Sequence, residues 1–277
     1  MGTPSDGTTK TVNAIERADA AQWHRSRLLA SKTYFSVVGD ISLSDMKTAL
    51  EEQLNGWSAE TEELESSPQD VETNTGIVLV DMPGSEQTAI RILTPAFANN
   101  SAEQYAAELS GIVMGGSFTS RLNSILREEK GYTYGIGARF IQEKDKSYLM
   151  VRTSVRTDVT VASVKEIYTI LASAADGYSE EEIQKAKSTS RSSIIGMSAE
   201  RKSMASNNLY AMLNGESPDF LSTDLRAIAS VSADEMKTTA PYFNPTNGIV
   251  ILIGDSSQYE AELQNAGFET KRVLLPE

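Results

Sequence analysis

Short apolar runs alternate along the chain with longer amphipathic stretches, and glycine, proline or clustered polar residues separate them. Apolar runs of this length predict strands, and two pairs of them are joined by turn signals, at Pro83-Gly84 and at 144–147. Two hairpins with helices between them predict an α+β fold, an antiparallel sheet covered by helices. The predicted strands are 77–80, 89–93, 134–141, 148–155 and 249–253.

The amphipathic stretches begin at residues that favour helix starts. Ser101, Ser179 and Ser232 are each followed three positions later by Gln or Glu, the pattern of a capping box. The first predicted helix reaches about Met114, where Gly115 and Gly116 interrupt it and a second helix follows. The other predicted helices are 159–175, a long region from 179 toward 213 with an interruption near Gly196, and one that begins at 232.

One pattern occurs twice, once near each end of the chain. Ala18-Asp19 precedes Gly39-Asp40, and Ala233-Asp234 precedes Gly254-Asp255 at the same spacing. Each Gly-Asp ends an apolar run and is followed by a helical pattern. The pattern indicates a repeated domain end, and coincidence between short, common dipeptides is the alternative.

The repeat, if real, divides the chain into parts. Residues 1–57 are then the C-terminal remnant of a first domain with a strand at 34–38, and the start of the chain is truncated. Residues 58–75, acidic and without a basic residue, are a linker. Residues 76–277 are a complete second domain.

Composition excludes several classes of function. The chain has 25 basic and 38 acidic residues, a net charge of −13, which disfavours nucleic acids and anionic membranes as partners. It has no cysteine, so disulfides, thiolate nucleophiles and cysteine-based zinc sites are excluded. No apolar run approaches the roughly 18 residues of a membrane span, and the first residues do not resemble a signal peptide.

The sequence offers few groups for metal or nucleophilic chemistry. His24 is the only histidine and lies in a predicted amphipathic helix, whereas zinc usually takes three protein ligands. Carboxylate-only sites for Mg²⁺ or Ca²⁺ and a serine–lysine dyad stay open, but no known loop or nucleophile motif marks them. Gly115-Gly116-Ser117 lacks the lysine of a phosphate loop and is better interpreted as a tight turn between helices.

Arg127 and Tyr134 are the most suggestive pair. Arg127 ends a predicted helix, Gly131 permits a turn, and Tyr134 begins a strand soon after it. The plain alternative is a surface arginine and a strand-end tyrosine. The functional interpretation is that both donate hydrogen bonds to a substrate carbonyl, or to the negative charge that develops on it during hydrolysis.

Four stretches together resemble the pitrilysin/insulinase family, zinc peptidases with an inverted His-x-x-Glu-His motif. They are Val80-Asp81-Met82-Pro83-Gly84-Ser85-Glu86-Gln87, Gly115-Gly116-Ser117-Phe118-Thr119-Ser120-Arg121-Leu122, Leu126-Arg127 with Gly131 and Tyr134, and the two strand–Gly-Asp–helix stretches. The resemblance implies pairs of α+β domains in two halves that enclose a chamber. One half carries zinc, and the other contributes an arginine and a tyrosine, which match Arg127 and Tyr134.

One histidine cannot build that zinc motif. The resemblance therefore implies a chain without metal, inactive alone, that binds peptide substrate beside zinc on a partner half. The partner would be a zinc-bearing subunit or a second copy of the full-length protein. The parent could instead carry a zinc motif in a missing N-terminal segment. Two alternatives from other classes are a non-enzymatic structural subunit and a scaffold that binds peptides along an exposed sheet edge.

Overall fold

The computed structural model describes most of the chain, in two compact units. One unit comprises Met1–Glu72 with Met197–Pro218, and the other comprises Thr73–Gly196 with Asp219–Glu277. The predicted acidic linker, 58–75, lies outside the described residues except for its last position. The division into a remnant, a linker and a complete second domain stays a prediction. The described residues are 6–57, 75–98, 101–142, 147–217 and 219–273.

The first unit is helical in its described part. Ser42 caps α3, and its Oγ accepts a hydrogen bond of 3.1 Å from the Asp45 amide, so the helix expected after Gly39-Asp40 is present. The strand predicted at 34–38 is wrong, because residues 33–38 form no regular structure. A strand needs a neighbour to pair its backbone groups, and the described part of this unit contains no other strand. Its helices are α1 (Thr9–Asn13), α2 (Arg17–Arg27), α3 (Leu43–Gln53) and α7 (Arg201–Leu213).

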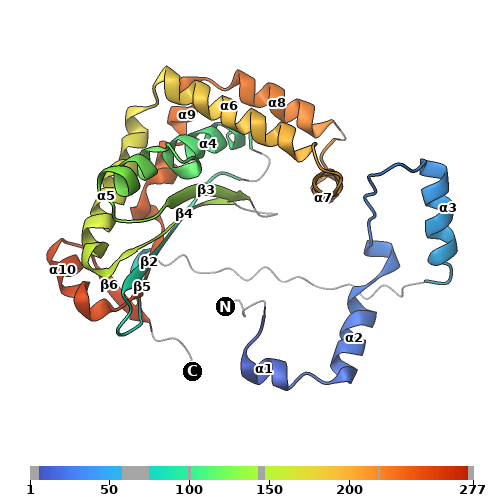
Figure 1. Cartoon of the computed structure of the whole chain (residues 1–277), viewed down its shortest axis with the longest axis horizontal. Helices are drawn as coiled ribbons and strands as arrows, with labels where there is room; N and C mark the ends of the chain where they lie inside the picture. Colours follow the sequence, from blue (N-terminus) through green and yellow to red (C-terminus); the bar gives the residue numbers. More distant parts are fainter. Residues whose placement is uncertain (1–5, 58–74, 99–100, 143–146, 218, 274–277) are drawn as a thin grey trace. The chain divides into compact units, whose positions relative to one another are not determined.

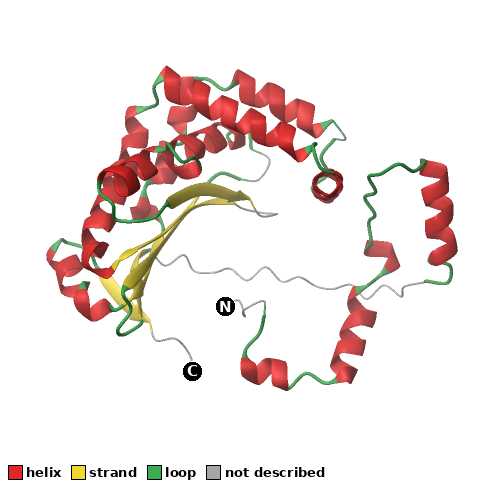
Figure 2. Ribbon diagram, viewed as in Figure 1, coloured by secondary structure: helices red, strands yellow, loops and turns green. Residues whose placement is uncertain are grey.

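The second unit is built on one six-stranded sheet in the order β3-β4-β2-β5-β1-β6. Figures 1 and 2 show the helices gathered on one face of it. The predicted α+β class, a sheet covered by helices, is confirmed. The strands are β1 (Gly76–Asp81), β2 (Gln87–Pro95), β3 (Ile136–Gln142), β4 (Ser147–Arg156), β5 (Ile249–Gly254) and β6 (Thr270–Val273).

One predicted hairpin is confirmed and the other is wrong. β3 and β4 pair antiparallel, with Ile136 opposite Thr153. β1 and β2 do not pair, because β5 lies between them, antiparallel to β2 and parallel to β1. β5 is a continuous aliphatic run, the kind of strand that suits the middle of a sheet covered by helices. With β6 also parallel to β1, the sheet is mixed rather than wholly antiparallel.

The helices of the second unit begin largely as predicted. Ser179 and Ser232 form capping boxes, in which their amides donate to Glu182 and Glu235 at 2.8 and 2.7 Å. The box at Ser101 is wrong, because the hydroxyl of Ser101 closes a turn with the Glu103 amide at 3.0 Å and the helix begins at Gln104. The helices are α4 (Gln104–Gly111), α5 (Thr160–Ala172), α6 (Glu180–Met197), α8 (Phe220–Ser230), α9 (Ala233–Thr238) and α10 (Glu260–Asn265), and two π-helical segments, Ile112–Gly116 and Asn123–Glu129, follow α4.

The sheet buries one face and leaves the other more accessible. Side chains alternate along β4, with Leu149, Val151 and Val155 almost fully buried in the core against the helices. The intervening residues at even positions, 148–156, point to the opposite face, where Arg152, Ser154 and Arg156 are exposed. We call this second surface the open face; it consists of these β4 positions, residues 89, 91 and 93 of β2, and 137, 139 and 141 of β3.

Candidate functional site

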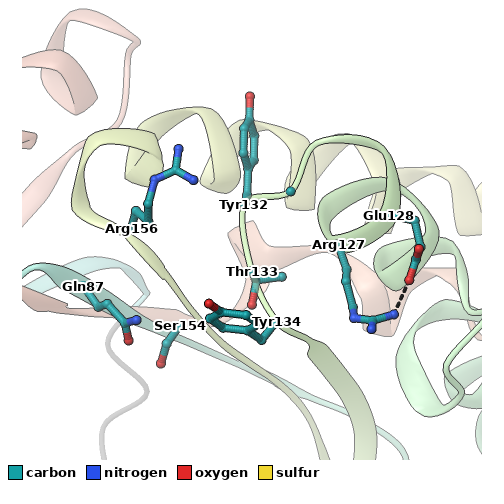
Figure 3. Close-up of a pocket in the computed structure, with 9 residues that line it drawn as sticks. Gln87, Arg127, Glu128, Tyr132, Thr133, Tyr134, Ser154 and Arg156 are labelled. Atoms are coloured by element: carbon teal, nitrogen blue, oxygen red, sulfur yellow. Dashed lines mark hydrogen bonds and ion pairs between the residues drawn. The ribbon is translucent and has the colours of Figure 1, made fainter.

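Arg127, Gly131 and Tyr134 meet at one pocket of about 360 Å³ beside the open face. The segment between the second π-helical segment and β3 forms one wall, and the ends of β2 and β4 form another (Figure 3). The sequence-predicted pair is thus brought together. The lining residues are Gln87, Arg127, Glu128, Gly131, Tyr132, Thr133, Tyr134, Ser154 and Arg156.

Arg127 is held from two sides. Its guanidinium forms an ion pair with Glu128, drawn as a dashed line in Figure 3, and lies 4.0 Å from the centre of the Phe118 ring, a cation–π contact. The side chain keeps 30% of its surface accessible. An arginine fixed on a helix end and still accessible is suited to donate hydrogen bonds to a bound group.

Gly131 turns the chain from the helix toward the strand. Its φ is +64°, in the left-handed region that disfavours residues with a Cβ. The next amide, of Tyr132, donates to the Leu126 carbonyl at 2.9 Å, which closes the turn against a fully buried leucine. The turn therefore fixes where residues 132–134 leave the helix.

Tyr134 extends into solvent from a well-anchored backbone. The hydroxyl of Thr133 bonds the Thr153 hydroxyl at 2.8 Å and donates to the Gly135 carbonyl at 2.9 Å. Tyr134 itself is 96% exposed, and the described residues give its hydroxyl no hydrogen-bond partner. Figure 3 shows its ring above Ser154, whereas the hydroxyl of Tyr132 points away from it. The phenol is free to meet a ligand.

Asn123 anchors this wall to the sheet. Its side-chain nitrogen Nδ2 donates to the Ile136 carbonyl at 2.7 Å, and its side-chain oxygen Oδ1 accepts from the backbone amide of Ile136 at 3.1 Å. Asn123 is buried, so both bonds lie where water competes little. The sequence pattern did not indicate this residue, because an asparagine inside a helical pattern gives no local signal of a contact with the following strand.

The sequence analysis also missed the three lining residues that come from strands. Ser154 and Arg156 come from β4 and Gln87 from β2, with Gln87 directly opposite Arg156 in the sheet. Arg152 and Ser154 are alternate residues of the predicted strand 148–155, and Arg156 continues the same spacing just beyond it. This spacing places the three on one face and was the available signal. Arg156 also pairs with Asp158, Nε to Oδ1 at 3.1 Å.

Gly115 and Gly116 do not reach this pocket. They end the π-helical segment Ile112–Gly116 and line a separate hollow of about 200 Å³ with Gly137, Arg139 and Arg152. A Cβ built on Gly115 would lie 2.5 Å from the Cβ of Ala138 and 2.6 Å from its amide nitrogen. Gly115 thus allows the helix end to pack directly on the backbone of the edge strand β3.

Arg121, in the same Gly-Gly…Ser-Arg-Leu stretch, has a structural rather than a site role. Its Nε and Nη2 donate to Glu182 at 2.7 and 2.9 Å, and its Nη1 donates to the Ser173 carbonyl at 3.1 Å. Hydrogen bonds from Arg121 lower the pKa of Glu182 to about 2. The group links the π-helical segment Asn123–Glu129 to the end of α5 and the start of α6.

The described residues contain no group of three His, Cys, Asp or Glu side chains placed to hold a metal ion. His24 is exposed on α2. The described residues therefore do not fit a zinc site. None of the described helices is long and apolar enough to cross a membrane.

Comparison with known proteins gives the family. The family model described as the Peptidase M16 inactive domain matches residues 14–190, more than half of the chain. The chain belongs to this family. An uncharacterized zinc protease of Rickettsia felis is 24% identical over 246 residues, which cover 87% of this chain and 58% of that protein. The resemblance to zinc peptidases inferred from the motifs is confirmed. The chain spans little more than half the length of this relative.

Solved structures agree on the fold. The M16 inactive domain from Pseudomonas fluorescens matches with a TM-score of 0.79 at 21% identity, over 91% of this chain and 60% of that one. A chain of complex III2 from Candida albicans matches with a TM-score of 0.74 at 18% identity, over 92% and 63%. At these identities the likeness concerns the fold alone.

Proposed function

We propose that this M16 inactive domain is the metal-free part of a zinc peptidase, in which Arg127 and Tyr134 bind the peptide substrate. Zinc would be held by a partner half, either a zinc-bearing subunit or a second copy of the full-length protein. The observation that carries the proposal is the convergence of Arg127 and Tyr134 on one open pocket, with the described residues offering no metal-binding group.

The two side chains suit the recognition of a peptide bond. A guanidinium and a phenol both donate hydrogen bonds, and a peptide carbonyl accepts them. Arg127 is held by Glu128 and Phe118, and the backbone of Tyr134 is fixed through Thr133. Donors positioned beforehand stabilise charge that develops on a carbonyl oxygen during hydrolysis, and losing one typically lowers the rate by about 10²–10³-fold.

The test is peptide turnover by the complete, zinc-containing assembly. We expect Tyr134→Phe to lower kcat/KM by about 100-fold, while the zinc content of the assembly and the folding of the chain stay unchanged. Tyr132→Phe is the matched control. Tyr132 lines the same pocket, but its hydroxyl points away from Tyr134. Arg127→Ala is expected to act like Tyr134→Phe. Wild-type turnover in both Tyr134→Phe and Arg127→Ala would refute the proposal.

A structural subunit is the second candidate function, because a chain that belongs to a larger assembly, complex III2, has the same fold. The discriminating experiment is purification of the full-length parent, followed by measurement of bound zinc and of chelator-sensitive peptidase activity. A zinc peptidase that co-purifies supports the first proposal. A stable assembly without zinc or turnover supports the structural role.

The other alternative is a scaffold that binds peptides along an exposed sheet edge, and the edge of β3 is partly covered. Gly115 packs against the amide nitrogen of Ala138, so this part of the edge already has a neighbour. Peptide affinity that survives in Arg127→Ala would favour binding at another edge.

A further inference from the structure

The open face carries a group of arginines next to the pocket, although the chain has a net charge of −13. Arg91 on β2 lies directly opposite Arg152 on β4. Arg139 on β3 is opposite Met150, one face position further along, and Arg156 follows Arg152 on β4. We call these four residues the arginine band.

The band is electrostatically unfavourable for the fold by itself. Like charges directly opposite each other on neighbouring strands destabilise a sheet, and this acidic chain has many carboxylates that could neutralise them. Within the described part of the chain, no ion pair involves Arg91, Arg139 or Arg152. Arg91 donates instead to the carbonyls of Ile90 and Thr153, both at 2.9 Å.

Three residues of the arginine band line hollows in the surface. Arg139 and Arg152 line the 200 Å³ hollow, and Ser154 and Arg156 line the 360 Å³ pocket with Arg127 and Tyr134. The two hollows thus follow each other along β4, from Met150 to Arg156. At about 3.4 Å per residue this distance is roughly 20 Å, the length of about six residues of an extended peptide.

Gly137 leaves space on the edge strand β3 for the side chain of Arg152. It lies opposite Arg152 and has no side chain, and a Cβ built on it would be 4.0 Å from the Cγ and Nε of Arg152. The arginine side chain therefore lies over β3 beside Arg139. Two guanidinium groups line one small hollow, a suitable place for a carboxylate, which guanidinium binds with paired hydrogen bonds.

We propose that the open face selects peptides with acidic side chains, which the arginine band binds while the backbone passes Arg127 and Tyr134. The proposal rests on the proposed function and names its substrate class. Every second side chain of an extended peptide facing β4 meets the band. Acidic residues on that side are attracted, and lysine or arginine there is repelled.

The test measures peptide affinity in the whole chain of 277 residues by fluorescence anisotropy. The probes are three labelled peptides of the same length, in which alanine alternates with Glu, with Gln or with Lys. We expect the Glu peptide to bind about tenfold more tightly than the Gln peptide, and the Lys peptide to bind most weakly. The preference shrinks as NaCl rises, because salt screens exposed charges.

Two double variants distinguish an effect of the arginine band from an effect of the overall net charge. Arg139→Gln with Arg152→Gln removes two charges from the open face, and Arg191→Gln with Arg226→Gln removes two from exposed positions on α6 and α8. We expect the first double variant to lose the preference for Glu and the second to keep it. Equal binding of Glu and Gln peptides by the wild type would overturn the proposal, as would equal losses in the two double variants.

The failure of this proposal is distinguishable from that of the proposed function. The affinity measurement uses no zinc-bearing half, and both double variants retain Arg127 and Tyr134. No preference for Glu, together with impaired turnover in Tyr134→Phe, overturns only the acidic substrate class. A preference for the Glu peptide, together with wild-type turnover in Tyr134→Phe and Arg127→Ala, overturns only the proposed role of Arg127 and Tyr134 in turnover.

Discussion

Gly115 brings a helix end into close contact with the edge strand β3. There is no room for a methyl group, since the added Cβ would lie 2.5 Å from the Cβ of Ala138. Gly115→Ala is therefore expected to force the helix end away from β3 and lower the free energy of unfolding by about 1–3 kcal/mol. Denaturant unfolding monitored by circular dichroism measures this change.

Gly196→Ala is the matched control for that substitution. Gly196 lies in α6, and a Cβ added there meets no atom within 4 Å. Because alanine favours helix more than glycine does, this variant is expected to be unchanged or more stable by up to about 1 kcal/mol. A Gly115→Ala variant as stable as Gly196→Ala would contradict the close contact at Ala138.

The sequence identified Arg127 and Tyr134 because both belong to a local pattern around one glycine. Gln87, Ser154 and Arg156 belong to the same pocket through strand register, which depends on residues far apart in the chain. Local sequence signals therefore located one wall of the pocket and missed the other. The functional roles of Arg127 and Tyr134 stay predictions.

The Arg121–Glu182 pair connects three helical elements and makes stability depend on pH. The pKa of Glu182 is about 2 in the folded protein, below its ordinary value of 4.5, because Arg121 donates hydrogen bonds to the ionised form. A lowered folded-state pKa stabilises the fold above pH 4.5, and this contribution is lost as the pH falls from 4.5 toward about 2.

Glu182→Gln is expected to lower the free energy of unfolding at neutral pH and to change it much less near pH 2.5, where the stabilisation from the wild-type carboxylate is mostly lost. Unfolding by urea at several pH values measures the difference between the two proteins. Glu181→Gln, an exposed neighbour in the first turn of α6, serves as the control and should retain the wild-type pH dependence. A constant difference between Glu182→Gln and wild type at all pH values would contradict the pairing.

Elements formed by neighbouring segments were predictable, and elements that need distant partners were not. The β3–β4 hairpin pairs adjacent runs, so local pattern and turn signals were sufficient. The false hairpin of β1 and β2 arose because nothing near them indicates that β5, from a much later part of the chain, separates them. β6 was missed because it is four residues long and contains two basic residues.

The first unit exposes a group of large apolar side chains, three of which belong to the strand predicted at 34–38 and one to the start of α3. Tyr34, Phe35 and Val37 are 55%, 48% and 47% exposed, and Leu43 is 87% exposed. Exposed apolar groups of this kind bind hydrophobic dyes and promote association. The chain is therefore expected to bind the dye ANS and to self-associate as its concentration rises.

Phe35→Ser with Val37→Ser is expected to reduce both dye binding and self-association. Unfolding stability should change by less than about 0.5 kcal/mol, because exposed side chains away from caps and cores contribute little. ANS fluorescence and light scattering after size-exclusion chromatography measure the two effects. Met82→Ser, 49% exposed in the other unit, is the control. Dye binding that is the same in the double variant and in Met82→Ser would contradict this source of association.

The central position of β5 has a consequence for the newly made protein. β5 bonds β1 on one side and β2 on the other, yet the ribosome makes it long after both of them. At roughly 5–20 residues per second, the two earlier strands wait about 10–30 seconds for β5, and during that time β1 lacks both of its neighbours, because β6 is made later still. During synthesis the nascent chain therefore exposes open strand edges on β1 and β2, where chaperones could bind or strands of neighbouring chains could pair until β5 and β6 have emerged.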